Sequence, residues 1–304
     1  MVEEKILDKE YLMKVDMDLK MIPLTFDVVL KGVFERNQDL LKRFIISVLK
    51  LEIDLSNTDI EITKNELLKE NVKEYQKRVD ILVILNDKIY VDIEINRSSF
   101  EKSKFRNSLY CDKLYTTLLE TGEKASELKN FYLYQLNLNT EDKSTPYGED
   151  MIVMYSTTTK EIFIDNKIMI LKYLEFYRKL YYTNVDKLKE DEIWLAALTA
   201  RNFTELNKML AHILNDVDRS RFVKEAIRMS KSKINLAEWE AEKLNEMARE
   251  KAHTRALNEG VKKGINDTII NMIKNDIPIE TIKKVTGKTI EEIELLKNQA
   301  STKN

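Results

Sequence analysis

Two short segments, residues 79–85 and 89–96, alternate between apolar and polar side chains and predict a β-hairpin. One face of this hairpin is wholly apolar, whereas the other carries the acids. A shift of the pairing by one residue would move every apolar side chain to the wrong face. A turn of three residues, 86–88, keeps the apolar faces together and places Asp80 directly opposite Glu94. The hairpin therefore predicts two neighbouring carboxylates.

These two carboxylates suggest a metal site. Cross-strand partners lie about 4.5–5.5 Å apart at Cβ, so Asp80 and Glu94 would repel each other without a cation between them. Mg²⁺ (or Mn²⁺) suits this place, because such ions are typically held by one or two carboxylates with waters and substrate phosphate. Arg78 would lie opposite Asn96, where it could contact a phosphate oxygen. The alternative is a half-exposed hairpin whose acids share nothing, and the pattern alone leaves both open.

The composition excludes several other kinds of site. His212 and His253 are the only histidines and Cys111 is the only cysteine, which excludes an ordinary structural zinc site and an internal disulfide. The six glycines form neither a phosphate-binding loop nor a dinucleotide fingerprint. The net charge of −2 argues neither for nor against nucleic acid. A bound metal would therefore be a hard cation held by carboxylates.

The chain also lacks the features of a membrane or secreted protein. No apolar run approaches the roughly 20 residues needed to span a bilayer. The first ten residues are acidic and lack the basic-then-apolar layout of a secretory signal. We expect a cytoplasmic protein with no membrane partner, and the single cysteine suits a reducing compartment.

Helical and extended patterns alternate between Pro23 and about residue 180, which predicts an α/β architecture. We expect an N-terminal extension over residues 1–20, an α/β domain over 21–180 and an all-helical region over 185–304. The helix after the hairpin is expected to turn five side chains inward: Phe105, Leu109, Tyr110, Leu114 and Leu118.

The helical half offers two candidate interaction surfaces. Residues 221–263 carry a modest excess of basic residues, so that a helix presenting Arg228, Lys231, Arg249 or Arg255 could track a phosphate backbone. The alternative is a solvated face with Glu at i,i+4. Residues 279–296 predict two short helices around Gly287. A DNA-reading helix-turn-helix is disfavoured there, because acids crowd the second helix. A docking or dimerisation element, through which a homodimer could form, is the better prediction.

Several short stretches follow one another in a particular order and spacing. They are Leu24-Thr25-Phe26-Asp27 leading into Lys31 and Phe34, Arg78-x-Asp80, Ile93-Glu94-x-Asn96, Arg106 with Tyr110, and the run over residues 279–296. In this order they resemble the recombination-promoting nuclease and transposase-like group of the PD-(D/E)XK superfamily. The resemblance covers most of residues 21–175 and roughly the last 30 residues.

The resemblance implies a restriction-endonuclease-like mixed sheet flanked by helices, followed by the all-helical region. It implies that Asp80 and Glu94 are the catalytic, metal-binding acids and that Asp27 is an auxiliary acid from the first helix. Asn96 stands at the catalytic position where the group has lysine or, often, glutamine. Arg106 and Tyr110 would contact substrate.

Three of these assignments have alternatives. An acid such as Asp27 is favoured in the first turn of any helix by the helix dipole. Tyr110 could belong to the core with Arg106 extending past its edge. Lys102 or Lys104 could supply the positive charge that Asn96 lacks, or could be ordinary solvated lysines.

Together these features predict a Mg²⁺-dependent DNA endonuclease associated with recombination or mobile elements. The alternative is a catalytically inactive nuclease fold that acts as a DNA-binding or protein-interaction module, which the neutral Asn96 favours.

Overall fold

The hairpin predicted from the sequence lies within the sheet of the computed structural model, which describes residues 19–63, 80–97, 100–119, 124–140 and 147–301. Strands β2 (Ile81–Leu85) and β3 (Ile89–Asn96) pair antiparallel in the expected register, with Ile81 opposite Ile93. The three-residue connection is confirmed. Asn86 and Asp87 adopt φ angles of 49° and 57° there, in the left-handed region that Asn and Asp tolerate better than most residues.

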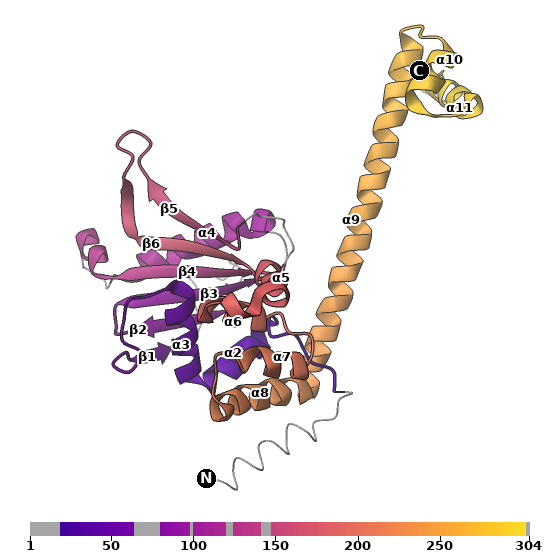
Figure 1. Ribbon diagram of the computed structural model, residues 1–304. Helices are drawn as coiled ribbons and strands as arrows, with labels where there is room; N and C mark the ends of the chain where they lie inside the picture. The colour runs from indigo at the N-terminus through magenta and orange to yellow at the C-terminus, as the bar shows by residue number, and fades with distance from the viewer. Residues whose placement is uncertain (1–18, 64–79, 98–99, 120–123, 141–146, 302–304) are drawn as a thin grey trace. The chain divides into compact units, whose positions relative to one another are not determined.

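Six strands form one mixed sheet in the order β1-β2-β3-β4-β6-β5 (Figure 1). The pairs β3–β4 and β4–β6 are parallel, and the other neighbours are antiparallel. The strands not yet described are β1 (Ile60–Ile62), β4 (Tyr132–Asn139), β5 (Glu149–Tyr155) and β6 (Ile162–Tyr173). The expected mixed sheet with flanking helices is confirmed.

Helices precede, interrupt and follow the sheet, as expected. They are α2 (Asp27–Glu35), α3 (Gln38–Leu49), α4 (Phe100–Thr116), η1 (Ala125–Asn130), α5 (Leu174–Asn184), η2 (Val185–Lys187), α6 (Glu190–Ala197), α7 (Phe203–Leu210), α8 (Asp216–Lys231), α9 (Lys233–Lys274), α10 (Ile279–Thr286) and α11 (Ile290–Ser301).

A cluster of buried aromatic rings holds four of these helices together. Phe34 of α2 lies 5.3 Å from Phe44 of α3 and 5.7 Å from Phe222 of α8, between ring centroids. Phe44 in turn lies 5.9 Å from Trp194 of α6. Gly32 permits a close approach of α2 and α8, because a Cβ atom there would lie 2.4 Å from Cε of Met229. This packing fixes α2, whose first residue is Asp27.

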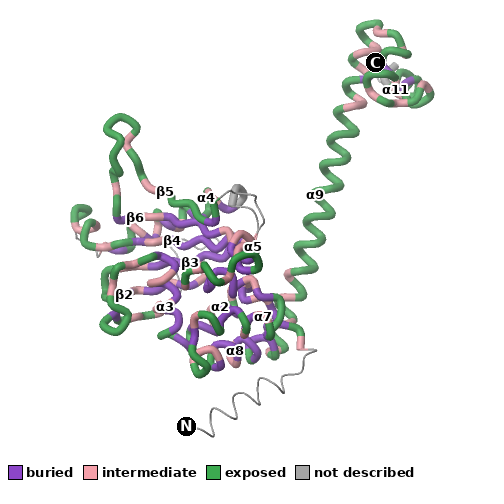
Figure 2. The backbone as a smooth tube through the Cα atoms, viewed as in Figure 1, coloured by how far each residue is buried: buried purple, intermediate pink, exposed green. Residues whose placement is uncertain are grey.

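The two faces of the central strands differ in chemistry, although both are buried (Figure 2). The face with Ile81, Val83, Val91 and Ile93 is apolar. The other face is polar near the ends of β3 and β4. It carries Asp92, Glu94 and Asn96 beside Gln135, Asn137 and Asn139, all of them buried.

Helix α4 packs on this second face, and the expectation for its inward side chains is partly wrong. Cys111, Leu114 and Leu118 are buried, but Phe105 is 79% exposed and Leu109 is 45% exposed. Ser103 and Asn107 take the inward positions instead. The sheet beneath this end of α4 is polar, so polar side chains of the helix meet it.

The chain divides into two compact units, Met1–Ala237 and Glu238–Asn304. Helices α5 to α8 belong to the unit that contains the sheet, so the expected division near residues 180–185 lies inside that unit. The proposed separation into a domain over 21–180 and a helical region over 185–304 stays a prediction. The expected extension over residues 1–20 lies almost wholly outside the described residues.

In the second unit, α10 and α11 pack against the end of α9 around Ile269, Ile282 and Ile293. Gly287 ends α10 with a φ angle of 69°, as a left-handed helix cap. Ile293 therefore packs against residues of the same chain, whereas Leu295 is exposed. A homodimer through these helices stays a prediction. No helix among the described residues is both long enough and apolar enough to cross a membrane.

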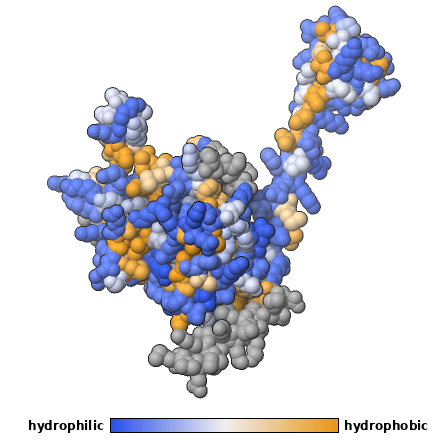
Figure 3. Space-filling view, viewed as in Figure 1, coloured by the Kyte–Doolittle hydropathy of each residue, from blue (hydrophilic) through white to orange (hydrophobic). Residues whose placement is uncertain are grey.

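The hairpin of β5 and β6 exposes several apolar side chains. Hydrophobic atoms gather along its stem in Figure 3, and the exposed residues there include Met151, Met154, Ile162 and Phe163. Phe163 is 74% exposed, so its ring adds little to the core.

The aromatic cluster predicts a clear contrast in stability. Phe44→Ala should lower the free energy of unfolding by about 3–5 kcal/mol, because it leaves a cavity between Phe34 and Trp194. Phe163→Ala should change it by no more than about 0.5 kcal/mol. Urea unfolding followed by circular dichroism would measure both, and equal losses would contradict this description of the core.

Candidate active site

A small polar pocket of about 160 Å³ lies where the ends of the hairpin, α2 and α4 meet. Its lining residues are Asp27, Asp80, Glu94, Ile95, Arg97, Arg106 and Tyr110. The structure therefore brings together five residues that the sequence nominated from three separate segments. Arg78, also nominated, lies outside the described residues.

The two acids of the hairpin hold each other in place through the backbone. The Ile95 N–H donates to Oδ2 of Asp80 at 2.7 Å. The Asp80 N–H donates in turn to the carboxylate of Glu94. Glu94 is only 3% exposed, and among the described residues no donor reaches its Oε1 atom. Oε1 of Glu94 can therefore bind a ligand.

Simultaneous ionisation of Asp80, Asp92 and Glu94 is unfavourable, because their negative charges would repel one another. Burial raises the pKa of Glu94, and repulsion from Asp92 and Asp80 raises it further. Burial also raises the pKa of Asp80, with a smaller contribution from the charge of Asp27. The pKa of Asp92 is raised chiefly by burial and then by the charge of Asp80. A cation in this pocket would relieve the repulsion.

Two arginines border the same pocket. The positive charge of Arg106 opposes the rise in the pKa of both Asp80 and Glu94, and Arg97 acts in the same way on Asp80. The guanidinium of Arg97 lies over the Phe26 ring at 5.1 Å and 3.9 Å from Oδ1 of Asp27. The pocket thus combines acids that can bind a cation with cations that can bind a phosphate.

Asn96 lies behind this pocket in a buried network of amides. Its Nδ2 donates to Oδ1 of Asn137 at 3.1 Å, and its Oδ1 accepts from Nδ2 of Asn107 at 3.0 Å. Nη2 of Arg106 also donates to Oδ1 of Asn96, at 3.2 Å. With 1% of its surface exposed, Asn96 orients Arg106 but does not line the pocket itself.

Arg106 is held on α4 by more than this contact. Its Nε donates to Oδ1 of Asn107 at 3.2 Å, and its guanidinium lies 5.9 Å from the Tyr110 ring centroid. Tyr110 is half-buried and lines the pocket, so it belongs neither wholly to the core nor wholly to the surface. The structure places the pair beside the acids, as a substrate-contacting role requires.

Lys104, one of the two lysines considered as substitutes for the charge that Asn96 lacks, does not take that position. Nζ of Lys104 lies 5.4 Å from the Phe105 ring centroid, and Lys104 does not line the pocket. The side chain of Lys102 lies outside the described residues. Among the described side chains of α4, Arg106 is the cationic one that contacts Asn96 and lines the pocket.

Sequence reasoning missed Arg97 and the amides of β4. Gln135 links Asp92 to α4, because its Nε2 donates to Oδ2 of Asp92 and to the Asn107 carbonyl, both at 3.0 Å. The signal was present in β4, where Gln135, Asn137 and Asn139 alternate with leucines. This alternation predicts that β4 directs amide side chains, and not apolar ones, toward the helix that covers that face of the sheet. Arg97 directly follows the Glu94-x-Asn96 motif.

The donor set of the pocket fits a hard divalent cation. Asp80 and Glu94 supply carboxylate oxygens, and Mg²⁺ commonly uses one or two carboxylates with waters and phosphate oxygens. Within the described ranges no three His, Cys, Asp or Glu side chains come close enough to form a complete protein cage. The carboxylates of Asp80 and Glu94 therefore fit one hard divalent ion.

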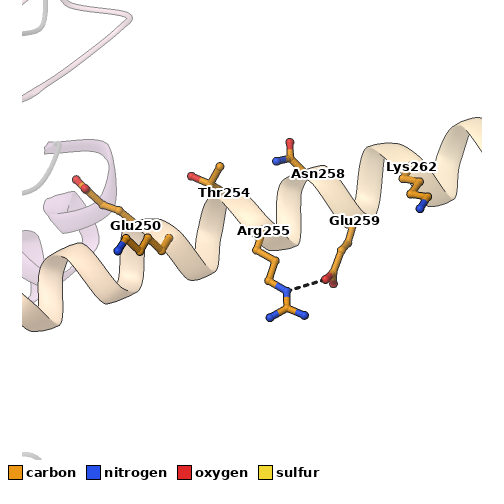
Figure 4. Close-up of a pocket in the computed structure, with 7 residues that line it drawn as sticks. Glu250, Thr254, Arg255, Asn258, Glu259 and Lys262 are labelled. Carbon is orange, nitrogen blue, oxygen red and sulfur yellow. Dashed lines mark hydrogen bonds and ion pairs between the residues drawn. The ribbon is translucent and has the colours of Figure 1, made fainter. Parts of the chain in front are cut away.

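A second hollow runs along α9 and has a different character (Figure 4). All its lining residues come from this one helix, among them Glu250, Asn258 and Lys262. Nε of Arg255 lies 2.9 Å from Oε1 of Glu259, one helical turn away. This i,i+4 pair matches the expected solvated face, and the hollow has no buried acid.

Comparison with protein families places the chain in a family. A family model described as PD-(D/E)XK nuclease family transposase matches residues 24–259, more than half of the chain. Searches among curated proteins and among solved structures gave no significant match. The matched range contains every lining residue of the pocket between the hairpin, α2 and α4.

The amide network yields a prediction about stability. Asn107→Ala should lower the free energy of unfolding by about 1–3 kcal/mol, because buried oxygens of Asn96 and Asn137 lose a donor. Ser108→Ala, an exposed neighbour on the same helix, should have little effect. Urea denaturation of the two variants would test this, and a neutral Asn107→Ala would show that the network is dispensable.

Proposed function

Because the chain belongs to the PD-(D/E)XK nuclease family transposases, we propose that it is a metal-dependent endonuclease that hydrolyses phosphodiester bonds in DNA. The observation that carries the proposal is the pair of carboxylates, Asp80 and Glu94, in a pocket bordered by Arg97 and Arg106. Nucleases of this superfamily generally use divalent metals. We propose Mg²⁺, or Mn²⁺ in its place, as the ion that Asp80 and Glu94 hold.

The bound ion would supply Lewis-acid activation of the scissile phosphate and of the attacking water. Asp80 and Glu94 hold that position through the reciprocal backbone hydrogen bonds of the hairpin. Arg106 is oriented by the oxygens of Asn96 and Asn107, so that its guanidinium can bind a phosphate oxygen and stabilise developing negative charge. Asp27 supports the site from α2, where Arg97 restrains it.

Arg106 is proposed to perform the task of the lysine or glutamine that this chain replaces with Asn96. Asparagine is neutral and is already engaged by Asn137 and Asn107. Its remaining contact is to Arg106. The positive charge thus comes from the next helix, and Asn96 serves as its positioning residue.

The biological setting proposed for this activity is recombination or the movement of mobile elements, in keeping with the transposase description of the family. A second candidate function rests on Asn96. Its burial and neutral amide also fit a nuclease fold that has lost turnover and serves as a DNA-binding or protein-interaction module. An assay of DNA cleavage distinguishes these two functions.

The proposal predicts metal-dependent nicking of supercoiled plasmid by the wild-type chain. Asp80→Asn should reduce the rate by at least about 100-fold, since loss of a metal ligand removes several kcal/mol of transition-state stabilisation. The control Asp150→Asn removes an exposed acid on β5 and should leave the rate unchanged. Plasmid that stays supercoiled with Mg²⁺ and with Mn²⁺, while a gel shift shows bound DNA, would favour the inactive module.

The proposed role of Arg106 predicts a graded series. Arg106→Gln should lower the cleavage rate by about 10- to 100-fold, as loss of one stabilising charge–phosphate contact would. Arg106→Lys should retain part of the activity, because it keeps the charge but loses the paired contacts with Asn96 and Asn107. Single-turnover rates would measure the series, and an Arg106→Gln variant as fast as wild type would remove Arg106 from the mechanism.

A further inference from the structure

Helix α4 presents an exposed apolar pair next to the pocket. Phe105 is 79% exposed, and Leu109, one helical turn further along, is 45% exposed. Their sequence neighbours Arg106 and Tyr110 line the pocket. The helix therefore carries two adjacent stripes, one that reaches the acids and one that offers an apolar surface beside them.

Cationic residues precede and follow Phe105 in the sequence. Nζ of Lys104 lies 5.4 Å from the Phe105 ring centroid, and the guanidinium of Arg106 is directed toward Asn96 and the pocket. An aromatic ring beside cationic side chains suits a nucleic acid, whose bases stack on the ring while its phosphates attract the charges. An apolar protein partner would have to bury these charges.

The pocket can accommodate a phosphate group but not the base attached to it. About 160 Å³ of largely polar space beside two carboxylates suits a phosphate group with its waters rather than a base. The base attached to that phosphate must then lie outside the pocket. Among the described side chains of α4, Phe105 is an exposed aromatic ring, and it directly precedes Arg106 in the sequence.

We propose that Phe105 and Leu109 form a stacking platform for an unpaired base next to the scissile phosphate. This proposal rests on the proposed nuclease function and specifies its substrate: DNA with a single-stranded or locally opened segment. In an intact duplex the base faces are covered by their stacked neighbours, so only an unpaired base can lie on the ring.

The test is binding in a Glu94→Gln background, where cleavage does not consume the probe. Fluorescence anisotropy would compare a labelled single-stranded 20-mer with the same sequence as a duplex, in Mg²⁺. Phe105→Ala should weaken single-strand binding by about 5- to 100-fold, as loss of one stacked base does, with little change for the duplex. Phe105→Trp should restore it.

The matched control is Phe163→Ala, which removes an equally exposed ring on β6 and should leave both affinities unchanged. An equal loss on both DNAs, no loss on either, or no binding of either DNA would overturn the platform. A change of oligomeric state on gel filtration with unaltered binding would assign the pair to a protein contact instead. Plasmid cleavage by the parent chain reports the proposed function separately, since it does not depend on this comparison.

Discussion

The gathering of three carboxyl groups at one end of a β-hairpin, two of them buried and Asp80 half-buried, is the constraint on which the rest of this structure depends. Asp92 and Glu94 lie on β3 within the sheet, and Asp80 meets Glu94 across the hairpin. Like charges at such a place are costly unless hydrogen bonds and cations compensate them. The pKa of each carboxyl group is raised for this reason. Arg97 and Arg106 offset part of this cost, and the metal ion that we propose would offset more of it.

The same constraint explains the character of the neighbouring elements. Strand β4 places Gln135 and Asn137 beside the acids. Helix α4 buries Asn107 against them, at a position where an amphipathic helix would ordinarily bury a leucine. Ser103 and Asn107 take the inward positions at this end of α4, and the apolar Phe105 and Leu109 are exposed. The buried aromatic rings of α2, α3 and α8 pack together and contribute to the stability of the unit that contains this polar site.

The hairpin could be predicted from the sequence in detail, because a period of two and one buried apolar face leave a single register, with Ile81 opposite Ile93. The inward face of α4 could not be predicted by the same reasoning, which assumes that the buried face of a helix is the apolar one. Asp27 was nominated by resemblance, and its approach to Arg97 depends on how α2 packs. The link from Asn96 to Arg106 joins separate segments through side-chain geometry, which short motifs do not encode.

The most direct test of the central claim, that Asp80 and Glu94 form a metal site, is thermal unfolding of the wild-type chain and of Glu94→Gln in EDTA and in Mg²⁺. An ion that binds only the folded state raises the Tm by mass action. The wild-type Tm should therefore rise with Mg²⁺. The variant should be no less stable than wild type in EDTA, since it relieves the repulsion among the buried acids, and it should not respond to Mg²⁺. A Mg²⁺ response that is equal in both chains, or absent from both, would contradict the account.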